Sequence, residues 1–82
     1  MNTEREIMRS KLAGLREKEQ KIELQAAPLV DEIRLTLNSA LNKFKDMEIS
    51  AAAVNMDKLM SLQGELLATD LEIERLQEAL DG

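Results

Sequence analysis

Residues 59–80 of the chain read LMSLQGELLATDLEIERLQEAL. Apolar side chains recur there at alternating steps of three and four residues, with one threonine in the series: Leu59, Leu62, Leu66, Thr69, Ile73, Leu76 and Leu80. This spacing predicts a helix with a heptad seam, a continuous apolar stripe along one face. Because such a stripe is unfavourable in water, we expect the upstream sequence to supply a helix that covers it.

Composition restricts what the chain can do. It has 82 residues, which is enough for one small domain, and it contains neither Cys nor His. Disulfides, thiolate zinc sites and the usual general base are therefore excluded. Phe44 is the single aromatic residue, so single-stranded nucleic acid has no platform on which its bases could stack. Self-association is the remaining source of stability for so short a chain.

The formal net charge is −5, and the acidic excess lies in residues 51–82, where Lys58 and Arg75 stand against seven acidic residues. An acidic surface argues against nucleic acid or an anionic membrane as a direct ligand. No apolar run approaches the roughly 20 residues of a transmembrane helix, and the N-terminus is charged, unlike a secretory signal. We expect a soluble, cytoplasmic protein without a small-molecule substrate.

The first helix is predicted over residues 3–45, and it starts at a capping box formed by Thr3 and Glu6. Pro28 is the strongest break signal in the chain. Two interpretations remain open: one long helix that is kinked at Pro28, or a second helix that begins there. The apolar spacing continues in phase on both sides of the proline, which favours the kinked helix.

The last helix is predicted over residues 50–80, with Ser50 as its cap and a turn at residues 46–49. Folding about this turn predicts a single all-α domain, an antiparallel, coiled-coil-like helical hairpin that comprises residues 1–82. The turn would place Lys21 opposite Glu74, so that flanking charges of opposite sign favour the antiparallel register.

A second apolar stripe runs along the last helix, and it indicates a second partner for that helix. In the predicted register, residues 3–13 also extend past the end of the last helix with an uncovered apolar face. We therefore expect the interface of a homodimer or higher oligomer, in a four-helix bundle, or the docking site of another protein. The candidate residues are Ile7, Met8, Leu12, Met56, Met60, Leu67 and Leu71.

Carboxylates are the only plentiful reactive groups. Because carboxylate metal sites in helix bundles also use histidine, which this chain lacks, we interpret Glu72, Glu74 and Glu78 as a solvated face. The sequence accordingly predicts no catalytic residue, cofactor or metal site. Polar residues occupy three seam positions, Glu19, Asn55 and Thr69. Each either sets the register of the helices or reaches water at the edge of the seam.

The function predicted from these features is non-enzymatic protein–protein interaction, by a small self-associating adaptor or regulator. One alternative is an acidic, phage-type inhibitor that occupies the binding site of a nucleic-acid-binding or defence protein. Another is a small structural or chaperone subunit of a secretion system or phage particle. The chain is similar in size to rod and needle subunits of type III secretion systems, and Leu59-Met60-Ser61-Leu62-Gln63 resembles their C-terminal helix. Residues 46–49 lack the proline-rich turn of needle subunits.

Overall fold

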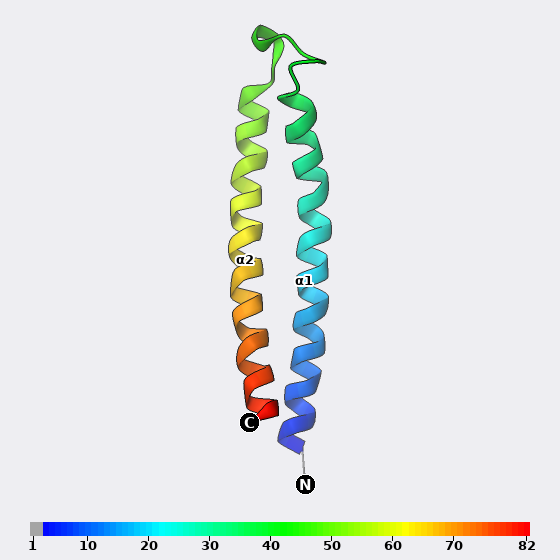
Figure 1. Cartoon of the computed structure of the whole chain (residues 1–82), viewed down its shortest axis with the longest axis vertical. Coiled ribbons are helices and arrows are strands. Elements are labelled where there is room, and N and C mark those ends of the chain that lie inside the picture. The colour runs from blue at the N-terminus through cyan, green and yellow to red at the C-terminus, as the bar shows by residue number, and fades with distance from the viewer. Residues whose placement is uncertain (1–2) are drawn as a thin grey trace.

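The computed structural model describes residues 3–82 as two long helices packed side by side in opposite directions (Figure 1). Helix α1 (Thr3–Thr36) is followed by a short 3₁₀ turn, η1 (Phe44–Asp46), and by helix α2 (Ile49–Asp81). The molecule is a rod of 66 × 16 × 15 Å. The predicted all-α antiparallel hairpin is confirmed, and the start of α1 lies beside the end of α2, at the end of the rod opposite the loop.

The two helices meet along the predicted heptad seam. Buried and half-buried residues recur at steps of three and four from Met8 to Thr36 in α1 and from Ala52 to Leu80 in α2. The most buried apolar side chains come from both helices: Leu12, Ile22, Ile33, Ala52 and Ile73. No side chain in the described part of the chain is completely enclosed, because each helix covers its neighbour from one side only.

Helix α1 ends at Thr36, earlier than predicted, and two asparagine side chains bind the backbone around its end. The amide of Ala40 donates to Oδ1 of Asn38 at 2.9 Å, and Nδ2 of Asn42 donates to the carbonyl of Leu35 at 2.9 Å. Such local side-chain bonds compete with the helical hydrogen-bond pattern. Nδ2 of Asn42 gives the carbonyl groups of Leu35 and Thr36, the last two residues of α1, a donor from outside the helix.

The predicted turn at residues 46–49 is therefore wrong, and the connection between the helices is a longer loop, residues 37–48. Phe44, which lies within the predicted first helix, is 81% exposed in this loop. Glu48 is the N-cap of α2, and Ser50 lies inside the helix instead of capping it. The observed bounds of α2 otherwise agree with the prediction to within one residue at each end.

Helix α1 runs through Pro28 without interruption, so the interpretation in which a second helix begins there is wrong. Figure 1 shows no sharp bend along the ribbon of α1, and the predicted kink is not confirmed. Pro28 is exposed, so the carbonyl group that loses its helical partner lies on the outer side of α1, where water can bind it.

Polar contacts near both ends of the rod establish the register of the hairpin. Near the chain termini, the guanidinium of Arg5 donates to the backbone carbonyl of Leu80. Toward the loop, Nδ2 of Asn55 donates to Oε2 of Glu32 at 3.0 Å. In this register, each α1 residue lies about two to three helical turns away from the α2 residue that the sequence predicted as its partner.

Two further predictions depended on the predicted register and are wrong. Lys21 is not level with Glu74, so the predicted charge pairing across the hairpin is wrong. Residues 3–13 do not extend past α2, because Leu12 is 9% exposed within the seam. Both errors follow from the loop, whose centre lies several residues earlier in the chain than the predicted turn.

Candidate interaction groove

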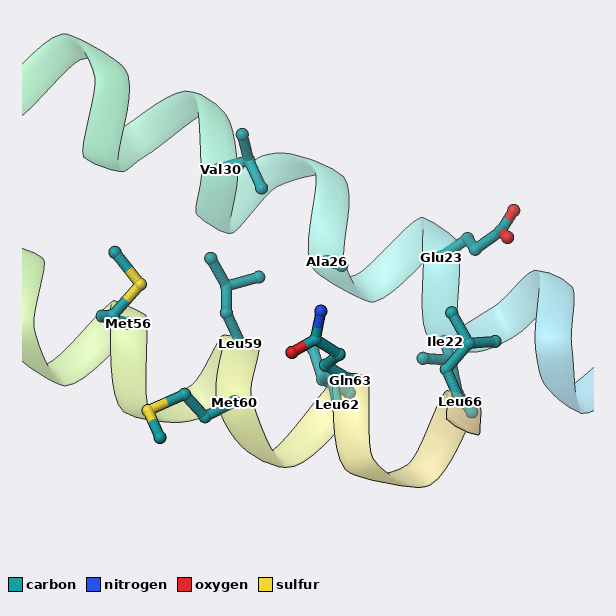
Figure 2. A pocket seen from close by; sticks show the side chains of 10 residues that line it. All are labelled: Ile22, Glu23, Ala26, Val30, Met56, Leu59, Met60, Leu62, Gln63 and Leu66. Carbon is teal, nitrogen blue, oxygen red and sulfur yellow. The ribbon is translucent and has the colours of Figure 1, made fainter. Parts of the chain in front are cut away.

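An apolar groove of about 380 Å³ runs between the two helices in the loop-proximal half of the rod (Figure 2). Its lining contains a single charged residue, Glu23, whose carboxylate points away from the groove. The remaining lining residues are Ile22, Ala26, Val30, Met56, Leu59, Met60, Leu62, Gln63 and Leu66. Water in such a groove finds few hydrogen-bonding groups, so an apolar occupant is favoured.

The groove exists because the two helices contribute side chains of different length. Helix α1 contributes Ala26 and Val30, which are short, whereas α2 contributes Met56 and Met60, which are long and flexible. Figure 2 shows Leu59 pointing between the helices, toward α1. The short side chains leave a depression beside the seam. The thioether side chains on its other wall can adapt to the shape of an occupant.

The groove lies on one side of the hairpin, which we call the groove face. This face is formed by the residues that come directly after a seam position in the sequence. Examples are Arg16 after Leu15, Val30 after Leu29, Met56 after Asn55 and Asp70 after Thr69. Residues that directly precede seam positions lie on the opposite side, which we call the charged face: Lys18, Glu32, Lys58, Glu65 and Glu72. The hydrogen bond between Asn55 and Glu32 crosses the hairpin toward the charged face.

Two carboxyl groups meet across the seam beyond the end of the groove. A side-chain hydrogen bond with Asp70 raises the pKa of Glu19, and burial and the negative charges of Asp70 and Glu23 raise it further, against the opposing charge of Arg16. Oδ1 of Asp70 is buried and has no hydrogen-bond partner among the described residues. The groove face therefore carries a buried carboxylate oxygen that has no hydrogen-bond donor within residues 3–82 of the hairpin.

The other two polar seam residues behave differently from each other. Asn55 reaches across to Glu32 on α1, as expected of a residue that sets the register. Thr69 is 3% exposed, and its hydroxyl donates to the carbonyl of Glu65 in its own helix at 2.7 Å. Thr69 is therefore satisfied locally and contributes no bond between the helices.

The structure separates the interface candidates that the sequence predicted. Met56 and Met60 line the groove and are exposed. Leu67 lies one to two turns further along the same side of α2 and is also exposed, as is Leu71 on the outer surface of the helix. These four residues remain candidates for contact with a partner.

The N-terminal candidates lie at the other end of the rod from the loop. Ile7 is exposed and Met8 is half-buried where the seam begins. The assignment of Leu12 to an external interface is wrong, because this side chain packs inside the hairpin. Sequence reasoning did not assign Ala26 and Val30 to the interface. Ala26 is a seam position before Pro28 and Val30 directly follows the seam position Leu29, so neither stands out as part of a separate apolar stripe.

No group of three or more potential metal-binding side chains occurs within residues 3–82. In the same part of the chain, neither helix has an apolar stretch long enough to span a bilayer. The chain matches no protein family, no curated protein and no solved structure.

Proposed function

We propose that this chain is a non-enzymatic protein–protein interaction module that self-associates through its groove face. The observation that carries the proposal is the groove itself, an apolar depression bordered by the exposed methionines Met56 and Met60. Exposed apolar patches rimmed by polar residues are typical of sites where proteins bind one another. A chain whose reactive groups are carboxylates, without His or Cys, has few means of catalysis.

The surface area of the hairpin supports self-association. A compact chain of 9.2 kDa is expected to expose about 4,900 Å², whereas this hairpin exposes 6529 Å². Burying the excess of about 1,600 Å² on each of two copies would give an interface of about 3,200 Å², within the range of obligate homodimers. Two hairpins packed face to face would form the four-helix bundle that the sequence predicts.

Sedimentation velocity on the parent chain and on Met60→Asp tests the proposal. The parent is expected to sediment as a dimer or higher oligomer. Met60→Asp places a charge in the groove, and it is expected to shift the protein to the monomer, because a desolvated and unpaired charge is strongly unfavourable.

Leu24→Asp is the matched control, since Leu24 is 73% exposed on the outer surface of α1. It introduces the same charge and should leave the oligomer intact. A parent chain that stays monomeric at every concentration would contradict self-association. A parent oligomer that survives Met60→Asp would place the interface elsewhere on the hairpin.

A further inference from the structure

We infer that the groove face binds a second copy of this chain with both loops at the same end, so that α1 of each copy lies on α2 of the other. The inference rests on the proposed self-association and specifies its geometry. A two-fold axis along the rod produces this arrangement, and the same surface patch is then used by both copies. The match of size and charge between the groove-face residues of the two helices supports it.

This axis brings together residues that are level with each other in one hairpin. The contact between Glu32 and Asn55 fixes these levels at the loop-proximal end. We count along both helices from this contact. In the proposed dimer, Val30 of one copy then lies opposite Met56 of the other, and Ala27 lies opposite Met60. Short side chains on α1 thus meet long side chains on α2 at both places, as close packing at an interface requires.

Charge matches in the same arrangement. Glu19 and Asp70 are level with each other, since their carboxyl groups meet across the seam. Arg16, on the groove face within one turn of Glu19, therefore lies opposite Asp70 of the second copy. Its guanidinium would supply a hydrogen-bond donor to the buried Oδ1 of Asp70, which lacks one in the single hairpin.

The alternative two-fold axis runs across the rod and places α1 on α1 and α2 on α2. It would bring Asp70 and Glu74 close to the level of Glu48 on the second copy, so that acidic residues would meet. It would also move Arg16 toward Leu37, beyond the end of α1. Juxtaposed like charges oppose association, and the arrangement with both loops at one end is therefore favoured.

Mixing two charge-reversal variants, Arg16→Asp and Asp70→Arg, tests the arrangement. Each variant alone should self-associate more weakly than the parent, by about tenfold or more in dissociation constant, because like charges face each other at both symmetric contacts. An equimolar mixture should recover the affinity of the parent, because the introduced aspartate of one chain then faces the introduced arginine of the other. Contacts within each hairpin are unchanged by mixing, so recovery reports contacts between chains.

Lys21→Asp and Glu72→Arg are the matched controls, because they make the same charge changes away from the groove face. Neither is expected to weaken association by more than about twofold. A mixture of Arg16→Asp and Asp70→Arg that binds no more tightly than either variant alone would overturn the inference. If the parent self-associates in the same experiment, such a result contradicts only the proposed arrangement. If the parent does not self-associate, the proposed function itself is wrong.

Cysteine cross-linking distinguishes the two axes directly, because the native chain has no cysteine. A mixture of Ala27→Cys and Met60→Cys should form disulfides between the two variants under mild oxidation. Ala27→Cys alone should cross-link poorly, since the two copies of that residue lie on diagonally opposite helices. Efficient cross-linking of Ala27→Cys with itself would instead support the axis across the rod and overturn the arrangement proposed here.

Discussion

Asn55 on α2 donates a hydrogen bond of 3.0 Å to the carboxylate of Glu32 on α1. Together with the bond from Arg5 to the carbonyl of Leu80 near the termini, it defines which turns of the two helices lie side by side. Most apolar contacts of a heptad seam would survive a shift by one heptad, whereas these polar contacts would not. They give a repetitive interface a single register.

The thermal midpoint of unfolding is expected to fall when the protein is diluted about a hundredfold, because dissociation of the oligomer precedes or accompanies unfolding. The measurement is circular dichroism melting at several concentrations, with sedimentation at each. Met60→Asp is the control and should melt at a midpoint independent of concentration. An invariant midpoint for the parent, with a monomeric mass, would contradict the prediction.

Leu12→Asp should unfold or strongly destabilise the hairpin, by about 3 kcal/mol or more, because it buries an unpaired charge in the seam. Circular dichroism should show loss of helix or a much lower thermal midpoint. Leu24→Asp on the exposed side of α1 should change the free energy of unfolding by less than about 0.5 kcal/mol. If Leu12→Asp keeps the parental midpoint, α2 does not cover this part of α1.

Glu19→Gln should raise the stability of the protein near neutral pH and have a smaller effect in acid. The pKa of Glu19 is raised above its ordinary value of 4.5 by the hydrogen bond to Asp70, by burial and by the charges of Asp70 and Glu23, against Arg16. The folded state therefore binds this proton more tightly than the unfolded state does. Its contribution to stability is full below pH 4.5 and is lost as the pH rises through the raised pKa.

Thermal midpoints of the parent and of Glu19→Gln, measured from about pH 4 to pH 8, check the sign of this effect. Glu17→Gln removes the same charge at an exposed position of the same helix and serves as the control. Equal effects of the two variants at every pH would show that the contact with Asp70 has no influence on stability.

Pro28→Ala should stabilise the protein and leave the oligomer intact, because it restores a backbone donor inside a continuous helix. In helix interiors alanine is favoured over proline by up to about 3 kcal/mol. Denaturant unfolding measures the gain, and Gln25→Ala at a nearby exposed position controls for changes in side chain alone. A loss of stability would mean that the chain depends on a bend at Pro28.

The seam could be predicted because heptad spacing is a property of the sequence alone. The end of α1 could not, because Leu37 and Leu41 continue the apolar spacing past the point where the helix stops. Where the helix ends, Oδ1 of Asn38 accepts a hydrogen bond from the amide of Ala40, and Nδ2 of Asn42 donates to the carbonyl of Leu35. A regular apolar pattern does not reveal such bonds.

The candidate site was predictable only on the α2 side. Met56 and Met60 stand out in the sequence as part of a second apolar stripe. The opposite wall of the groove depends on Ala26, and its short side chain indicates a depression only when the residue that faces it across the seam is known. Glu19 was recognised as a polar seam residue. Its partner Asp70 depends on the register, which the misplaced turn had shifted.

The start of α1 and the end of α2 lie at the same end of a rod of 66 Å, and this determines how the hairpin responds to mechanical force. A load applied between Thr3 and Gly82 would act on the contacts nearest the termini first and then pass to the next turn, as in the opening of a zipper. A load between the loop and the free end of α2 would strain many contacts of the seam together, in shear. The same contacts would therefore resist the second direction of pulling much more strongly than the first.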